Sequence, residues 1–276
     1  MMKKIVLLLN AILIATIGLY AQPQFKIDGE EVYSGDDVVF HQIDEHTWVG
    51  TGKAMSNESL YLVEGNEKAL LIDAGTNIKG LDKIVESITS KPYTVVATHV
   101  HPDHTGPSID VFSEIYINEA DTVGIPQFMP DYKGEVKFLK DGEIFDLGGR
   151  KIEVVFTPGH TPGSTTFIDK AAKYGFSGDS FGSGNLLLTT NFSTLKNTCE
   201  KMSKVMADNG ITELYPGHFF GGNKETKKRV DDLEKISEEA LSGDLKGDEN
   251  PQGFMGLNLL INRDGVRVNY SAQALK

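Results

Sequence analysis

The sequence THVHPDHTG, residues 98–106, follows directly on the apolar run Tyr93–Ala97. It places three imidazoles and one carboxylate within six residues, His99 to His104. At the end of an extended strand, His99 and His101 point to the same side, because side chains alternate along a strand. The turn that follows lets Asp103 and His104 face a second point nearby. The chain has only seven histidines in all, so a chance cluster of exposed histidines is a poor explanation. The stretch indicates two adjacent sets of metal ligands, where a single tetrahedral site needs one.

Three further fragments repeat the same arrangement later in the chain. They are FTPGHTPGS with His160, FSGDS with Asp179, and LYPGH with His218. Each fragment alone is weak, because a histidine or aspartate beside glycine is often turn chemistry. Each of these residues nevertheless stands where an apolar strand gives way to a loop. The ends of stacked strands converge on one edge, so we expect these groups to meet.

The order of these motifs resembles the metallo-β-lactamase superfamily. The pattern is HxHxDH, then a lone histidine, an aspartate and a last histidine, and the upstream IDAG with Asp73 is similar to that family's first motif. The match runs from about Asp37 to His218. The resemblance implies an α/β fold, a four-layer αββα sandwich with the metals at one edge of the paired sheets. It is specific for the fold and the metal centre, and a poor guide to the substrate.

The resemblance also implies a role for each residue. His99, His101 and His160 correspond to the ligands of a first zinc ion, and Asp103, His104 and His218 to those of a second. Asp179 corresponds to the carboxylate that bridges both ions, and Asp73 to the group behind the ligands that orients them. Nitrogen and carboxylate ligands also suit iron or manganese. Thiolate ligation is excluded by count, because Cys199 is the only cysteine.

The expected chemistry follows from the two ions. Two zinc ions about 3.5–4 Å apart lower the pKa of a shared water toward 7 and provide hydroxide at neutral pH. Asp103 is expected to orient this nucleophile for attack on a carbonyl or phosphoryl centre. Asn185, in SGNL after Asp179, is a candidate donor to the developing oxyanion. A simple turn asparagine explains Asn185 equally well. Residues 51–58 and 128–132 are expected either to shape the pocket or to pack as ordinary loops.

Departures from the patterns within the family bear on the substrate. The β-lactamases closest to this layout carry arginine at the position of His104 and cysteine at that of Asp179. The present residues are more similar to those of thioesterases, lactonases and esterases. We therefore expect a hydrolase that cleaves an ester, lactone, thioester or amide-like bond of a small-molecule substrate. A β-lactam hydrolase is the alternative, favoured by the Asn185 segment and by export. A metal-binding module without turnover is a third reading.

Composition and charge set the organisation of the chain. A basic start, an apolar stretch to Tyr20 and the small Ala21 predict a signal peptide over residues 1–21, followed by one hydrolase domain over residues 22–276. The protein is then periplasmic or secreted, with no membrane attachment after cleavage. Two of the 27 basic residues lie in the signal, which leaves 25 against 39 acidic residues, a formal charge of −14. That charge argues against a nucleic-acid partner. The sequence does not indicate an oligomeric state.

Hydrophobic periodicity predicts alternating strands and helices, with helices outside and sheets inside. The predicted strands are residues 38–40, 47–49, 60–63, 69–72, 93–97, 113–118, 152–156, 165–168, 173–177, 214–215, 257–261 and 266–270, and the predicted helices are residues 78–90, 194–209 and 224–241.

Overall fold

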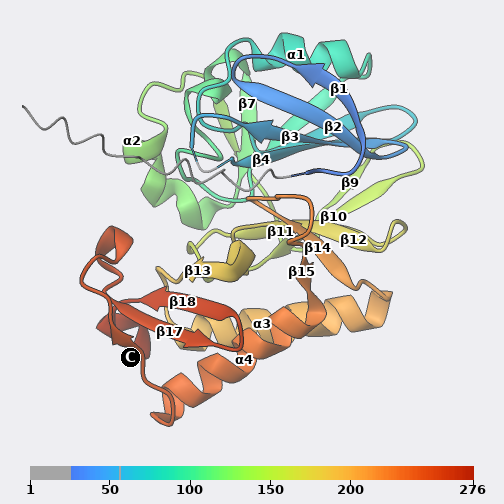
Figure 1. The fold of residues 1–276 in the computed structure, drawn as a ribbon. Helices are drawn as coiled ribbons and strands as arrows, with labels where there is room; N and C mark the ends of the chain where they lie inside the picture. The colour runs from blue at the N-terminus through green and yellow to red at the C-terminus, as the bar shows by residue number, and fades with distance from the viewer. Residues whose placement is uncertain (1–25, 56) are drawn as a thin grey trace, which may run out of the picture.

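The computed structural model describes residues 26–55 and 57–276. Two sheets lie face to face, and helices cover the outer face of each (Figure 1). The predicted four-layer αββα arrangement is thus confirmed. The predicted signal peptide, residues 1–21, lies outside the described residues. Within the described part, no helix combines the length and apolar character needed to span a membrane.

The first sheet has eight strands in sequence order. Neighbouring strands are antiparallel from the first strand to the fifth and parallel from the fifth to the eighth, so the fifth strand takes part in both kinds of pairing. It is covered by helix α1 (Leu81–Ile88). Its strands are β1 (Glu30–Ser34), β2 (Val38–Asp44), β3 (Thr47–Gly52), β4 (Ser59–Glu64), β5 (Ala69–Ile72), β6 (Tyr93–Val96), β7 (Glu114–Ile117) and β8 (Glu135–Phe138).

The second sheet has six strands, and helices α3 and α4 cover it from below (Figure 1). A third, smaller sheet lies beside these helices and contains the C-terminal hairpin. The second sheet comprises β15 (Glu225–Thr226), β14 (Glu213–Pro216), β12 (Tyr174–Gly178), β11 (Thr165–Asp169), β10 (Lys151–Phe156) and β9 (Ile144–Asp146). The third sheet comprises β13 (Asn185–Leu187), β18 (Val266–Tyr270), β17 (Leu259–Arg263) and β16 (Asp248–Glu249), and the remaining helices are α2 (Ile125–Phe128), α3 (Phe192–Asn209) and α4 (Lys227–Ser242).

Side-chain alternation on β4 and β5 explains how the first sheet is packed on both faces. Leu60, Leu62 and Leu71 pack toward α1, whereas Tyr61 and Val63 pack between the two sheets. Successive side chains on a strand point to opposite faces, so a strand covered on both sides reads as a continuous apolar run. A third core joins the second sheet to α3, α4 and the C-terminal hairpin. Three apolar cores therefore separate four layers.

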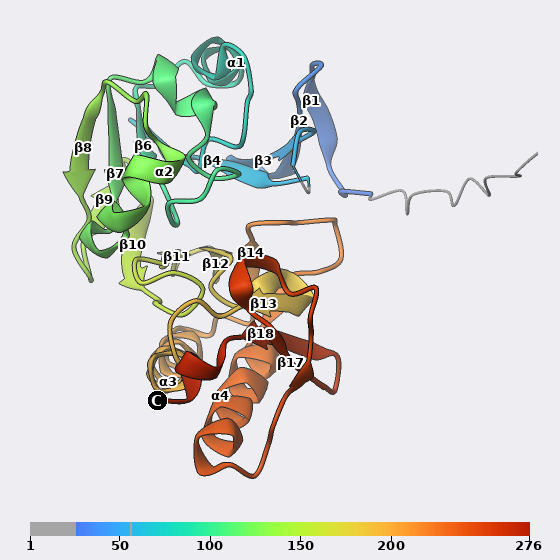
Figure 2. The same ribbon diagram turned by 90° about the vertical axis from the view of Figure 1, so that its left-hand side faces the viewer.

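Strand direction brings the predicted ligands to one edge. In the first sheet, strands β5 and β6 run parallel. In the second sheet, β10 and β12 share one direction because β11 is antiparallel to both, and β14 runs parallel to β12. The loops after their carboxyl ends carry all the candidate ligands. In Figure 2 these loops lie between the two halves, on the side of the molecule that also carries α2.

Most predicted elements are present, with shifted ends. The helix expected over residues 78–90 is α1, and it begins only after Gly80, which has a left-handed φ of 63°. The helix expected over residues 224–241 begins at Lys227, because Glu225 and Thr226 pair with β14 and the Thr226 side chain caps the helix. Strands β1, β8, β9, β13 and β16 were not anticipated. They are short or polar, so their sequences lack a clear period.

Candidate metal centre

Three histidines meet at one point beyond the strand ends. The Nε2 of His99 lies 3.1 Å from Nδ1 of His101, and that nitrogen lies 3.0 Å from Nε2 of His160. His99 and His160 are almost fully buried, and His101 is 9% exposed. The three come from the loop after β6 and the loop after β10. They form the first ligand group that the sequence predicts.

Hydrogen bonds behind this first group set the ring orientations. The Nδ1 of His160 donates to the carbonyl of Leu187 at 2.8 Å, which leaves Nε2 with a free lone pair. The Nδ1 of His99 lies 3.1 Å from the hydroxyl of Thr98. Burial, together with the neighbouring His104, holds the pKa of His99 well below its usual value. A neutral imidazole is the form that binds a metal ion.

Asp103, His104 and His218 form the second group. The Nε2 of His218 lies 3.4 Å from Oδ2 of Asp103, and the Nε2 of His104 lies 3.9 Å from the same oxygen. His104 is fully buried, while Asp103 and His218 are half-buried. The second predicted group therefore also converges, and two of its three members are partly exposed to solvent.

Asp179 lies between the two groups. Its Oδ1 is 3.8 Å from Nε2 of His104, and its Oδ2 is 3.7 Å from Nε2 of His160 and 3.5 Å from Nε2 of His218. Burial opposes ionisation of this carboxyl, but His218 and His104 outweigh it and lower its pKa well below the usual value. Oδ1 thus lies beside the second group and Oδ2 lies between the two groups, so this carboxylate borders both of them.

Asp73 lies directly behind the second group. Its carboxylate accepts hydrogen bonds from the backbone N–H of Thr98 (2.7 Å), the Thr98 hydroxyl (2.8 Å) and Nδ1 of His104 (2.8 Å). Its own φ is 64°, a left-handed conformation that costs a non-glycine residue about 1–3 kcal/mol. This strained conformation places one carboxylate where it bonds both Thr98, directly before His99, and the ring of His104.

Two buried polar atoms at the centre show that the residues fit a metal ion. Nε2 of His104 and Oδ1 of Asp179 are buried, and neither has a hydrogen-bond partner within the described residues. Buried polar atoms are almost always paired, so each such atom needs an explanation. Imidazole nitrogens and carboxylate oxygens suit zinc, iron or manganese. A metal ion between the two groups would satisfy both atoms.

Two acidic residues that sequence analysis missed connect the loops around the ligands. The carboxylate of Asp121 is buried and accepts from the N–H of Val100 (2.9 Å), the N–H of Gly163 (2.6 Å) and the Thr161 hydroxyl (2.8 Å). It therefore joins the loop of His99 and His101 to that of His160. Glu58 is also buried and accepts from the N–H of Thr76 at 2.9 Å, close after Asp73 in the chain.

Asn185 is the first residue of β13. It is exposed, and its side-chain oxygen accepts a hydrogen bond from Asn269 at 2.8 Å. Two residues later, the carbonyl of Leu187 accepts the bond from His160. The structure thus brings the seven predicted ligands and Asp73 together. Its geometry leaves the oxyanion role of Asn185 a prediction.

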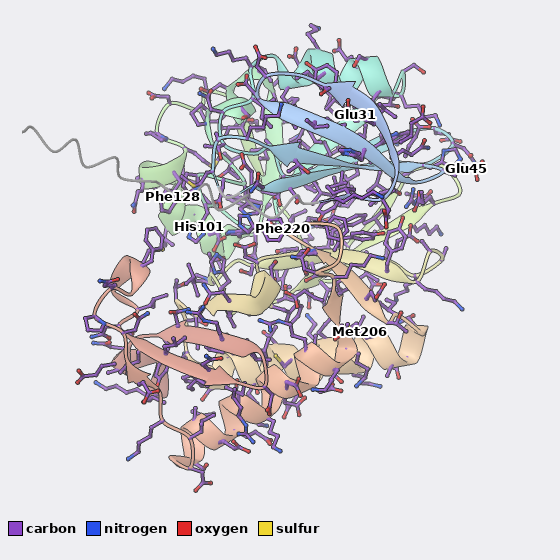
Figure 3. All side chains as sticks on the ribbon, in the orientation of Figure 1. Glu31, Glu45, His101, Phe128, Met206 and Phe220 are labelled. Atoms are coloured by element: carbon purple, nitrogen blue, oxygen red, sulfur yellow. The ribbon has the colours of Figure 1, made fainter. Side chains whose placement is uncertain are left out.

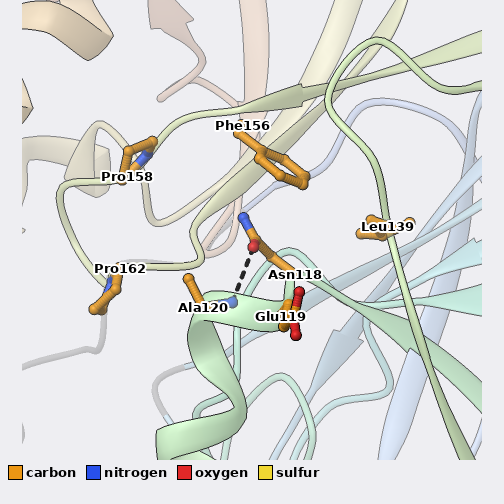
Figure 4. Close-up of a pocket in the computed structure, with 7 residues that line it drawn as sticks. All are labelled: Asn118, Glu119, Ala120, Leu139, Phe156, Pro158 and Pro162. Atoms are coloured by element: carbon orange, nitrogen blue, oxygen red, sulfur yellow. Dashed lines mark hydrogen bonds between the residues drawn. The ribbon is translucent and has the colours of Figure 1, made fainter.

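The surface near the centre includes Phe128, whose ring stands edge-on to His101 with centroids 5.3 Å apart (Figure 3). A separate cavity of about 470 Å³ lies between residues 118–120, Leu139 and the segment from Phe156 to Pro162 (Figure 4). Its walls include Pro158 and Pro162, which flank His160, and none of the residues lining it belongs to the ligand groups.

Comparison with known proteins agrees with this geometry. The family model of the metallo-beta-lactamase superfamily matches residues 56–218, more than half of the chain. The chain belongs to this superfamily. The expected class of the protein, a metal-dependent hydrolase, is thereby confirmed.

Several curated relatives of this family member are named as enzymes. The chain is 28% identical over 210 residues to the acyl-coenzyme A thioesterase MBLAC2 of Homo sapiens, covering 60% of this chain and 75% of that protein. It is 27% identical over 169 residues to an atrochrysone carboxyl ACP thioesterase of Aspergillus fumigatus, covering 59% and 51%. It is 28% identical over 146 residues to the hydroxyacylglutathione hydrolase GloC of Haemophilus influenzae, covering 45% and 67%.

Solved structures show the same fold. A metallo-beta-lactamase from Pontibacter korlensis matches with a TM-score of 0.58 at 19% identity, covering 73% of this chain and 99% of the other. A metallo-beta-lactamase family protein from Thermus thermophilus matches with a TM-score of 0.54 at 18% identity, covering 73% and 82%. At these identities the likeness concerns the fold alone.

Proposed function

We propose that this protein is an exported hydrolase with two zinc ions that cleaves the thioester or ester bond of an acyl substrate. The observation that carries the proposal is the position of Asp179, whose carboxylate lies within 4 Å of His160 in the first ligand group and of His104 and His218 in the second. His99, His101 and His160 would hold one ion, and Asp103, His104 and His218 the other. Thioesters come first because two of the three relatives described above are named as thioesterases.

The metal ions would supply a water ionised near neutral pH and a Lewis acid for the carbonyl oxygen. The residues of the chain do the rest. Asp103 is half-buried in the second group, and its carboxylate would orient the water and take its proton. Asn185 would donate its amide N–H to the oxygen of the tetrahedral intermediate, while Asn269 holds the other end of that amide.

A panel of substrates tests the bond type. We expect the mature protein to contain close to two zinc ions per chain by mass spectrometry, and to hydrolyse acyl thioesters and p-nitrophenyl esters only when metal is bound. The panel includes S-lactoylglutathione, a lactone, a phosphodiester and nitrocefin. Preferred turnover of nitrocefin would replace the proposal by the β-lactamase alternative. Metal binding without turnover on any substrate would favour a binding module.

Export is tested separately, because it concerns residues 1–21 alone. We expect the full-length chain, produced in a Gram-negative host, to be recovered from the periplasm with Gln22 as its first residue. N-terminal sequencing and cell fractionation provide the measurement. As a control, replacing the apolar Leu8 and Leu9 by arginine should keep the chain in the cytoplasm with Met1 retained or trimmed. An uncleaved wild-type chain in the cytoplasm would contradict export.

A further inference from the structure

The first sheet holds the loop that carries His218, although this loop follows a strand of the second sheet. Ser59, the first residue of β4, is 1% exposed. Its N–H donates to the carbonyl of Gly217 at 2.7 Å, and its hydroxyl accepts from the N–H of Phe219 at 2.8 Å. Gly217 and Phe219 are the two neighbours of His218 in the chain. One buried serine therefore fixes the backbone both before and after a candidate ligand.

Two further side chains hold the same loop. Tyr61 lies two positions after Ser59 on β4, so it is on the same face of the strand, and its hydroxyl donates to the carbonyl of Pro216. From the other side, the amide of Asn223 donates to the carbonyl of His218 at 2.7 Å. In Figures 1 and 2 the orange loop that joins β14 to β15 lies against the blue strands of the first sheet. The position of this loop thus depends on contacts between the two halves.

The backbone at Gly217 packs directly on two other candidate ligands. A Cβ atom at this position would lie 2.3 Å from Oδ1 of Asp179 and 2.7 Å from Cε1 of His104. The N–H of Gly217 donates to the carbonyl of Gly178, directly before Asp179, at 2.8 Å. A small movement of the segment would therefore displace His218 relative to both of these ligands.

We infer that Ser59 is a positioning residue for His218 and sets the affinity of the second ion without binding that ion itself. The inference rests on the two-ion centre of the proposed function. Without the Ser59 hydroxyl, the buried N–H of Phe219 would lose this acceptor, and an unpaired buried donor is costly, so the segment would shift. Groups that orient metal ligands typically contribute about 10–100-fold to metal affinity.

The test measures zinc affinity and needs no substrate. Metal-free protein is titrated with zinc in competition with a chromogenic chelator, which gives a Kd for each ion. We expect Ser59→Ala to raise one of the two Kd values by about 10–100-fold and to leave the other unchanged. The matched control is Ser237→Ala on α4, which removes another fully buried hydroxyl, one that donates to the carbonyl of Leu233 at 2.7 Å. This control should keep both wild-type Kd values.

A second background separates positioning from a general effect on the fold. His218→Ala should lose the same site that Ser59→Ala weakens, because it removes the ligand itself. Adding Ser59→Ala to His218→Ala should then leave the remaining site unchanged, since residues that act through one another are not additive. A serine that only stabilised the fold would weaken the remaining site in this background too, and that result would overturn the inference.

A variant on the other side of the loop keeps the test open if Ser59→Ala folds poorly. Asn223 is half-buried, and Asn223→Ala removes the donor to the carbonyl of His218, so it should weaken the same zinc site. Two zinc ions in the wild type, with both Kd values unchanged in Ser59→Ala and Asn223→Ala, would remove this inference alone. A single zinc site in the wild type would overturn the two-ion centre and the inference with it. Selective loss of one site, without hydrolysis of any substrate, would remove the proposed function and leave the role of Ser59.

Discussion

At the scale of single residues, the candidate ligands of the metal centre could be predicted from the sequence, whereas a residue that holds their loops together could not. The seven candidate ligands could be predicted because histidines and aspartates follow apolar strands in a recognisable order. Asp121 could not, because its partners are backbone N–H groups of loops 21 and 42 positions away. In sequence it reads as an acidic residue at the start of a helical turn. A carboxylate whose partners are all remote leaves no periodic or local signal.

Asp103 gives the sharpest test of the reaction at this scale. Replacing Asp103 by alanine should lower kcat by about 10²–10⁴-fold, the range lost when a positioned proton acceptor is removed. The rate must be measured at a zinc concentration that restores the metal content, so that loss of a ligand and loss of the acceptor are separated. Asp110→Ala, an exposed acidic residue near the same motif, is the matched control and should keep the wild-type rate. An unaffected rate in Asp103→Ala would contradict the role of Asp103 as the proton acceptor.

At the scale of elements, the third sheet, which borders the site through Leu187 on β13, could not be predicted from the sequence as a unit. Strand β13 has three residues, and it is a strand only because β18, about 80 positions later, pairs with it. The C-terminal hairpin could be predicted from the turn residues Asp264 and Gly265, and both have the positive φ that its tight turn requires. Its position beside β13 could not. Local patterns specify which segments become strands, but long-range packing selects their partners.

A buried acidic group in β15, directly before α4, makes stability depend on pH. Glu225 is 1% exposed and accepts a hydrogen bond from the N–H of Ser183, and its carboxylate lies 2.8 Å from the Arg229 guanidinium. Burial raises its pKa from 4.5 to about 7, although Arg229 acts in the opposite direction. These contacts connect α4 to the turn that follows Asp179.

The sign of the pH effect follows from that raised pKa. Protonated Glu225 is favoured in the folded state, so its contribution to stability is complete below pH 4.5 and is lost as pH rises to about 7. The loss is on the order of 2–3 kcal/mol for a shift of this size. We expect Glu225→Gln to flatten the change in the free energy of unfolding between pH 4.5 and 7.5, measured by urea denaturation. Glu249→Gln, at an exposed position, is the control and should retain the wild-type slope. Parallel curves for wild type and Glu225→Gln would contradict the prediction.

At the scale of the whole molecule, the two halves contribute to one site. His99, His101, Asp103 and His104 follow strand β6 of the first sheet, and His160, Asp179 and His218 follow strands of the second. The hydroxyl of Tyr61 on β4 donates to the carbonyl of Pro216 at 2.5 Å, two residues before His218. The fold class could be predicted because strand and helix periods alternate along the chain. The relative position of the halves depends on the core between the sheets, which no local pattern describes.

Metal removal should therefore destabilise the whole fold. Metal at a free concentration of 100 times its Kd adds about 2.7 kcal/mol to the folded state. For a domain of this size, chelation should then lower Tm by roughly 5–10 °C. Calorimetry of the chelated protein, before and after addition of zinc, provides the measurement. Magnesium is the control ion and should restore little, because it prefers oxygen ligands. A Tm that responds to neither chelator nor zinc would contradict a metal between the halves.

The division of the ligands between the halves has a consequence for how the protein obtains its metal. A chain still being synthesised has no complete pair of sites before His218 has emerged and β14 has joined the second sheet. Affinity alone ranks the divalent metals in a fixed order, so the ions available at the moment of folding decide which are bound. If export precedes folding, that moment falls outside the cytoplasm. The identity of the metal would then be a property of the compartment in which the last strand docks.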